Sequence, residues 1–188
     1  MKLVITMTAY RRLEYTREVL SALADCAGID QCLLLAQIEP GFPEVIDAFD
    51  AFNACECRPQ VNGRRLRLNR NTKTVLWRGY QQGGDAVLHL EDDTVPSPDA
   101  IRYFRWALEK FSDDETIFSV AGYNRSESCD LDPHAVRVRS WFTCWGWATW
   151  RTELREILQG WSEKNPKSFA WHVNFFNDTA PSEIYTLS

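Results

Sequence analysis

The chain has 188 residues, a formal net charge of -5, and a composition that is 45% hydrophobic and 13% aromatic. This length predicts one domain with a substantial core, and the aromatic content, which includes 8 Trp, excludes extended disorder. The acidic balance argues against a general nucleic-acid binder, because such a protein needs a basic surface.

No apolar stretch approaches the length that spans a bilayer, and residues 1–6 lack the pattern of a signal peptide. We therefore expect a cytoplasmic protein without an intrinsic membrane segment. A partner would be needed to attach this protein to the periphery of the inner membrane. The six Cys residues show no paired C-x-x-C spacing and no matching His ligands, so neither a zinc site nor a disulfide scaffold is favoured. We interpret Cys55 and Cys57 as thiols near a loop.

Apolar periodicity predicts strands and helices that alternate along the chain. The predicted strands cover residues 2–7, 32–38, 65–68, 86–90 and 116–121. The predicted helices cover residues 13–24, 42–52, 74–82, 97–111 and 148–158, and the fourth begins at the capping sequence Ser97-Pro98-Asp99. This order implies a single α/β domain with a mostly parallel central sheet and helices on both faces.

The most informative stretch is an apolar run of strand length that ends in Glu91, Asp92 and Asp93. Carboxylates seldom end a buried strand for packing reasons, whereas ligands of open α/β sheets bind at the carboxyl ends of strands. The triplet therefore indicates a hard divalent cation beside a phosphate-bearing substrate, with a solvated turn as the alternative. Because side chains alternate along a strand, Glu91 and Asp93 are expected on one face and Asp92 on the other.

Four segments together resemble the nucleotide-sugar-dependent glycosyltransferases of the Rossmann-like GT-A fold. They are residues 4–12 (VITMTAYRR), 69–73 (NRNTK), 89–93 (HLEDD) and 141–151 (WFTCWGWATWR). The resemblance covers residues 3–174 and includes bacterial family 2-type enzymes and the N-acetylglucosaminyltransferase I-like group. The triplet alone is weakly specific for this family. Its order and spacing relative to the aromatic segment are much more specific.

The resemblance implies an inverting transferase that moves a sugar from a nucleoside-diphosphate donor, a UDP-sugar by family frequency, to a hydroxyl acceptor such as a glycan. Asp93, with Glu91, matches the metal motif and would hold Mn²⁺ or Mg²⁺, which neutralises the departing diphosphate. Asp92 would face the ribose or the sugar. The other positions that match donor contacts are Thr8, Ala9, Tyr10, Arg11, Glu39, Asn71 and Arg78. An exposed acid is the alternative for Glu39, and a helix-face salt bridge is the alternative for Arg78.

The aromatic segment and the region after it hold the acceptor and base candidates. We assign Trp147 and Trp150 to packing, Trp145 to stacking on the acceptor, and Gly146 to a close backbone approach. An inverting enzyme also needs a general base. His172 stands where relatives often carry Asp, and its ordinary pKa suits neutral pH, although a structural His is the alternative. The other candidates for the base are Asp130 and Asp132, in a predicted polar loop.

Residues 177–188 resemble the translation of a common sequencing adapter, and we expect a poorly packed, non-native tail there. The transferase domain, residues 1–176, would then be incomplete at its C-terminus; a genuine polar tail is the alternative. Two other functions stay open. One is a nucleotide-sugar-binding fragment without turnover, and the other is a nucleotidyltransferase, although residues 8–12 lack the Gly-rich phosphate loop that is typical of that class.

Overall fold

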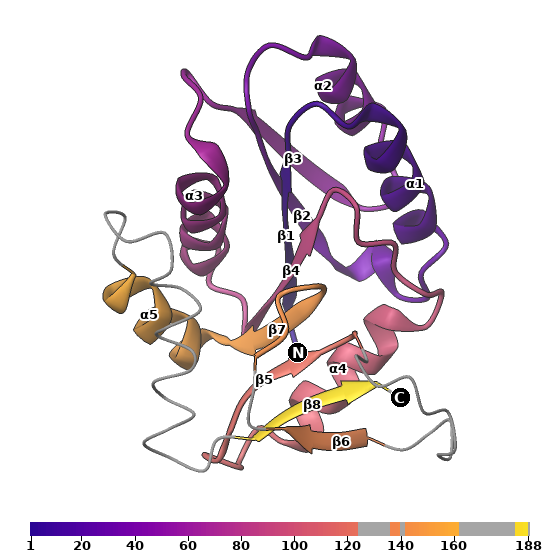
Figure 1. Cartoon of the computed structure of the whole chain (residues 1–188). Helices are drawn as coiled ribbons and strands as arrows, with labels where there is room; N and C mark the ends of the chain where they lie inside the picture. Colours follow the sequence, from indigo (N-terminus) through magenta and orange to yellow (C-terminus); the bar gives the residue numbers. More distant parts are fainter. Residues whose placement is uncertain (124–135, 140–141, 162–182, 188) are drawn as a thin grey trace.

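The computed structural model of the chain describes residues 1–123, 136–139, 142–161 and 183–187. The described strands form one sheet in the order β3-β2-β1-β4-β7-β5-β8-β6 (Figure 1). The strands are β1 (Leu3–Ala9), β2 (Leu33–Ile38), β3 (Glu56–Val61), β4 (Ala86–Glu91), β5 (Ile117–Ala121), β6 (Val136–Arg139), β7 (Trp147–Trp150) and β8 (Glu183–Leu187). The helices are α1 (Leu13–Ala24), α2 (Pro43–Asp50), α3 (Arg67–Gln81), α4 (Ala100–Lys110) and α5 (Arg151–Gly160), with a 3₁₀ turn at Ile29–Gln31.

The predicted mostly parallel sheet is confirmed by the strand pairings. β1 lies between β2 and β4 and is parallel to both, and β3 is parallel to β2. β7 pairs antiparallel with β4 and with β5, so β5 has the direction of β4. β8 is parallel to β5 and β6 is antiparallel to β8, so only β6 and β7 are reversed among the described strands.

Helices cover both faces of the sheet, as predicted, and alternate residues of β1 divide the core between them. Leu3, Ile5 and Met7 belong to the apolar cluster that includes buried residues of α1, α2 and α4. Val4 belongs to the cluster on the other face, with buried residues of α3 and α5. Figure 1 shows α1 and α2 on one side of the sheet and α3 and α5 on the opposite side.

The third strand is an error of the sequence-based assignment. Residues 65–68 do not form a strand, because α3 already begins at Arg67. The strand is β3, which includes Cys57 and lies at the edge of the sheet beside β2. Its sequence, ECRPQV, contains Pro59 and no apolar alternation, and an edge strand tolerates both because one side of it faces solvent.

The aromatic segment contains a strand that the sequence-based assignment missed. The helix predicted over residues 148–158 begins instead at Arg151, because residues 147–150 form β7 and pair with two neighbours. Within the tail, residues 183–187 form β8, which pairs with β5 and β6, whereas the poor packing expected of the tail stays a prediction. The boundary at residue 176 and the non-native origin of the tail stay predictions.

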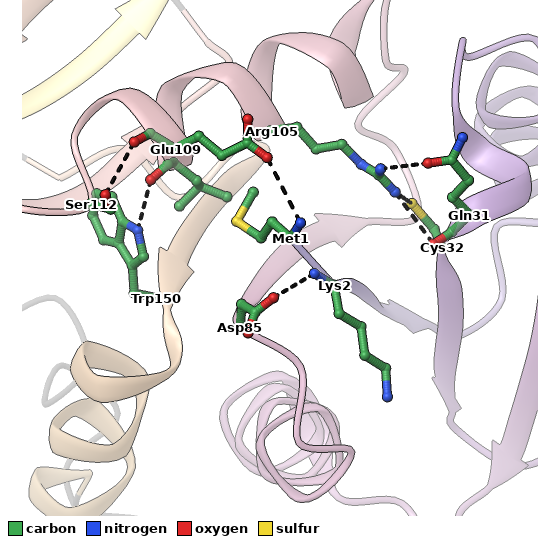
Figure 2. Close-up of polar contacts among 10 residues, drawn as sticks. Met1, Lys2, Gln31, Cys32, Asp85, Arg105, Glu109, Ser112 and Trp150 are labelled. Carbon is green, nitrogen blue, oxygen red and sulfur yellow. Dashed lines mark hydrogen bonds and ion pairs between the residues drawn. The ribbon is translucent and has the colours of Figure 1, made fainter.

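Polar contacts fix the amino-terminal ends of the strands (Figure 2). The backbone N–H of Lys2 donates to Asp85 at 2.6 Å, which ties the start of β1 to the start of β4. Arg105 of α4 donates to Gln31 at 2.9 Å. These contacts anchor β1 and α4 at the edge opposite the carboxyl ends of the parallel strands. In the part of the chain that the structure describes, no helix is both long and apolar enough to cross a membrane.

Candidate functional site

A cleft of about 600 Å³ opens where the carboxyl ends of β1, β2 and β4 meet. Its lining residues are Thr8, Ala9, Tyr10, Arg11, Arg12, Glu39, Arg65, Arg67, Leu68, Asn71 and Asp92. Seven of the eight predicted donor-contacting residues are among them, and Arg78 is the exception. The structure thus brings together residues that are as far apart in the sequence as Thr8 and Asp92.

Glu39 lies in the cleft wall but is neither exposed nor free. Its side chain is 3% exposed, and its carboxylate accepts hydrogen bonds from the backbone N–H groups of Leu66 and Arg67 and from the amide of Asn62. These are the N–H groups at the start of α3, where no earlier turn supplies an acceptor. Glu39 therefore fixes the start of α3. The alternative of an exposed acid is wrong, because Glu39 is buried.

Asn71 belongs to a buried chain of amides behind the cleft. Its Oδ1 accepts a hydrogen bond from Asn62 at 2.7 Å, and its Nδ2 donates to the Gln37 carbonyl at 3.0 Å. Gln37 in turn donates from Nε2 to Asn62 at 2.6 Å. This network ties the carboxyl ends of β2 and β3 to the amino-terminal part of α3 and so supports one wall of the cleft.

Arg78 lies apart from the other donor candidates. Its guanidinium donates to the carbonyls of Ala36 at 2.8 Å and Arg58 at 3.0 Å, and to Gln37 Oε1 at 2.9 Å. Burial is the main cause that lowers the pKa of Arg78. The side chain thus fastens α3 to β2 and β3, through carbonyl oxygens rather than through the salt bridge considered from the sequence.

The acidic triplet divides where β4 ends. Asp92 and Asp93 both bind Arg12: Nη1 of Arg12 is 2.5 Å from Asp93 Oδ2, and Nη2 contacts Asp92 Oδ1. Glu91 lines a neighbouring cavity instead. The predicted alternation, with Glu91 and Asp93 on one face, is wrong because β4 ends at Glu91 and a turn follows, in which Thr94 N–H donates to the Glu91 carbonyl.

Charge and burial shape the ionisation of this region. The hydrogen bond that Arg12 donates to Asp92, with the charges of Asp92 and Asp93, raises the pKa of Arg12. Burial raises the pKa of Glu91, and the neighbouring charges of Asp93 and Asp92 add to the rise. The three carboxylates therefore repel one another, and a cation at this place relieves the repulsion.

The donor set suits a hard divalent cation. Asp92 and Asp93 offer carboxylate oxygens, which are the ligands that Mn²⁺ and Mg²⁺ prefer. The positively charged guanidinium of Arg12 already lies between these two carboxylates. Within the described residues, no three His, Cys, Asp or Glu side chains form a ready-made metal-binding group. Binding of a metal would therefore require these side chains to rearrange.

A second cavity of about 710 Å³ adjoins the cleft and shares Arg65, Arg67 and Leu68 with it. Glu91 and His89 of β4 also line it. Burial lowers the pKa of His89 to about 4, so this imidazole is neutral at pH 7. The adjoining cavities offer room for two ligands, one beside Asp92 and one beside Glu91.

Trp145 and Gly146 lie beside the end of β4. Trp145 is 44% exposed and forms an edge contact with Tyr123, whose ring centroid is 5.0 Å away. Gly146 has a φ of 63°, which favours glycine, and a Cβ there would lie 3.3 Å from Thr94 Cγ2. An exposed aromatic pair thus lies near the acids. Trp147, by contrast, is 1% exposed, in agreement with its assignment to packing.

The three candidates for the base, His172, Asp130 and Asp132, lie outside the described residues. The structure adds Arg12, Arg65, Arg67 and Tyr123, which sequence reasoning did not select as site residues. One signal was present: residues 64–73 contain five basic side chains and no acidic one in a chain whose net charge is -5.

The fold and the cleft define an α/β domain with a candidate ligand site at the carboxyl edge of its sheet, and comparison with known proteins bears on the fold. No family model and no curated protein matches the sequence. Among solved structures, S. aureus TarS in complex with UDP-GlcNAc is similar, with 13% identity and a TM-score of 0.67, over 100% of this chain and 56% of that chain. This confirms the GT-A fold that the resemblance implied.

Two other structures share the fold. A mannosyltransferase from Pyrobaculum calidifontis in complex with GDP-Man and Mn²⁺ has 14% identity and a TM-score of 0.64, over 92% of this chain and 50% of that chain. A cytidylyltransferase from Leptospira borgpetersenii has 10% identity and a TM-score of 0.62, over 95% of this chain and 72% of that chain. The chain spans less than two thirds of the length of the glycosyltransferase structures, and identities this low show the fold alone.

Proposed function

We propose that this chain is a metal-dependent glycosyltransferase that moves a sugar from a nucleoside-diphosphate donor to a hydroxyl acceptor with inversion. The observation that carries the proposal is the cleft at the carboxyl ends of β1, β2 and β4, where an open α/β sheet binds its ligands and where seven of the eight donor candidates gather. Similar folds in complexes with UDP-GlcNAc and with GDP-Man and Mn²⁺ support the choice of donor and cation.

The donor is proposed to lie in the cleft, with its nucleoside against Thr8, Ala9 and Tyr10. Arg11, Arg65 and Arg67 line the same cleft and offer positive charge to a diphosphate. Asp92 is proposed to meet the ribose or the sugar with one part of its carboxylate. The metal ligands are proposed to be Asp93 and Glu91, with Asp92 beside them, once these side chains have rearranged around Mn²⁺ or Mg²⁺. The cation, when bound, would neutralise the charge that develops on the departing diphosphate.

The acceptor is proposed to bind beside Gly146 and the exposed pair of Trp145 and Tyr123, because a flat aromatic face suits a sugar ring. His172 is proposed as the base that takes the proton of the acceptor hydroxyl, with Asp130 and Asp132 as the alternatives. Replacing the true base by Ala should lower turnover by about 10²- to 10⁴-fold while the affinity for the donor stays unchanged.

A nucleotidyltransferase is the second candidate, and the shared fold with cytidylyltransferases favours it. That activity would release pyrophosphate from a nucleoside triphosphate, whereas a glycosyltransferase releases a nucleoside diphosphate from a nucleotide sugar. A nucleotide-sugar-binding fragment without turnover is the third candidate, and it would release neither product.

The products of the reaction separate these candidates. The purified chain with Mn²⁺ is incubated with UDP-glucose, UDP-GlcNAc or GDP-mannose, and separately with CTP and a sugar phosphate. We expect release of nucleoside diphosphate from one of the nucleotide sugars, with water as the acceptor of the sugar, and loss of this release in Asp93→Ala. Release of pyrophosphate alone would overturn the proposal in favour of nucleotidyl transfer, and binding of a nucleotide sugar with no release would indicate the fragment.

A further inference from the structure

Arg12 lines the cleft, and its guanidinium bridges Asp92 and Asp93, the last two acids of the triplet. Among the described residues that line the cleft, no other side chain does so. Its two terminal nitrogens bind different carboxylates, one from Asp92 and one from Asp93. Asp92 is nearly buried, with 6% of its side chain exposed. Such a carboxylate needs a compensating charge, and Arg12 supplies it in the present structure.

The Arg12 side chain is able to move without disturbing the fold. Its side chain is 42% exposed. Its backbone is held separately, because its carbonyl accepts hydrogen bonds from the N–H and the hydroxyl of Thr16, both at 2.9 Å. Besides the two acids, the guanidinium contacts only the ring of Tyr15 among the interactions of the described residues, at 5.8 Å from its centroid. It can therefore leave the acids while the start of α1 stays in place.

Arg12 and a divalent cation compete for the same oxygens. A metal ion at Asp92 and Asp93 would use the carboxylate lone pairs that now accept hydrogen bonds from Arg12. Two cations at contact distance also repel each other. Occupation by the metal and bridging by Arg12 therefore exclude each other.

The cleft also offers a place for a second anion that a released Arg12 would bind. Arg11, Arg65 and Arg67 line this cleft as well, so a diphosphate placed there is surrounded by guanidinium groups. Arginine binds phosphate oxygens through two parallel N–H donors, as it binds carboxylates. The diphosphate of the donor is thus the natural partner for Arg12 once the metal holds the acids.

We propose that Arg12 is an exchangeable internal cation and a diphosphate-binding residue. It neutralises Asp92 and Asp93 in the empty site, a divalent cation displaces it from them, and it then binds the diphosphate of the donor. This inference rests on the proposed function for the identity of the donor, but the competition between Arg12 and the metal does not require any nucleotide.

The first test measures the binding of Mn²⁺ alone. The electron paramagnetic resonance signal of the free ion monitors the binding. Arg12→Gln should bind Mn²⁺ about tenfold more tightly than the unaltered chain, because the internal competitor is lost. Arg17→Gln is the matched control: it removes the same charge from α1, where Arg17 pairs with Glu14, and should leave the Mn²⁺ affinity unchanged. Equal or weaker binding in Arg12→Gln, or no Mn²⁺ binding in either form, overturns the exchange.

The second test is titration of UDP at saturating Mn²⁺. Here Arg12→Gln should bind UDP about tenfold more weakly, the opposite sign to its effect on the metal. Tighter binding of both ligands would show that Arg12 only obstructs the site and would overturn its role at the diphosphate. If UDP fails to bind any variant while the Mn²⁺ shift is present, the exchange is supported and the proposed function fails.

Discussion

Glu39 shows how one buried side chain sets the local structure of the site. Sequence reasoning placed it in contact with the donor, whereas both of its oxygens already accept hydrogen bonds from the start of α3. Replacing a carboxylate that takes the place of a helix cap leaves those N–H groups without their acceptor. Its main contribution to the cleft is therefore to hold Leu66 and Arg67 in position.

We predict that Glu39→Gln loses about 2 kcal/mol of unfolding free energy, because the amide removes the charge and turns an N–H donor toward backbone donors. Urea unfolding measures the change. Glu44→Gln, at an exposed acid in the first turn of α2, is the control and should change stability by less than about 0.5 kcal/mol. A fully stable Glu39→Gln that has lost UDP binding would instead favour a direct donor contact.

His89 is buried inside the sheet and makes stability depend on pH. The Thr6 hydroxyl donates to the Leu88 carbonyl at 3.3 Å and lies 3.1 Å from His89 Nδ1, so Nδ1 carries the proton and donates. Burial lowers the pKa of His89 to about 4 from 6.5, so the unfolded chain binds the second ring proton, which makes the imidazole cationic, more strongly than the folded chain does. Stability is therefore complete above pH 6.5 and falls as the pH is lowered toward 4.

Between pH 7 and pH 5, His89 should account for a loss of about 2 kcal/mol in unfolding free energy. His89→Phe keeps a ring in the core and should lack this part of the loss. Urea unfolding of both forms at the two pH values gives the difference. An equal decline in the two forms would show that His89 does not carry the dependence.

At the scale of elements, Gly79 allows α3 to pack directly against the sheet. A Cβ on Gly79 would come within 2.8 Å of Thr6 Cγ2 and 3.2 Å of Val87 Cγ2. Both neighbours are β-branched and sit on strands, so neither gives way easily. The close approach positions the first turn of α3, and with it Arg67 and Asn71, at the cleft.

Gly79→Ala should therefore destabilise the protein by about 1–2 kcal/mol, even though Ala favours helix, because the added methyl overpacks the interface. Thermal unfolding is the measurement. Gly63→Ala is a suitable control, since nothing lies within 4 Å of its added Cβ, and it should be near neutral. A stabilised Gly79→Ala would mean that the helix moves away from the sheet without cost.

Strongly periodic elements were predictable from the sequence and weakly periodic ones were not. The bounds of α1 agree with the prediction, since its buried residues recur at helical spacing. β3 was missed because it is polar and lies at the edge, and β7 was missed because an aromatic run has no distinctive period. In both cases pairing with neighbours, rather than local preference, decides the structure.

At the scale of the whole molecule, the position of the cleft was predictable and its internal contacts were not. Acids at the end of a buried strand indicated the edge of the sheet at which the cleft opens, because carboxyl ends of parallel strands meet there. The bond between Arg12 and Asp93 joins residues 81 positions apart. No local pattern encodes such a partner, and the same holds for Arg78 and its carbonyl acceptors.

The central claim is that the carboxyl edge of the sheet binds a nucleoside diphosphate through a metal at the acids. Calorimetric titration of UDP with and without Mn²⁺ tests it most directly, in the unaltered chain, in Asp93→Ala, and in Asp113→Ala as the exposed control beyond α4. We predict binding that requires Mn²⁺, is lost in Asp93→Ala, and persists in Asp113→Ala. Binding of UDP that is equally strong without Mn²⁺ or in Asp93→Ala would contradict the claim.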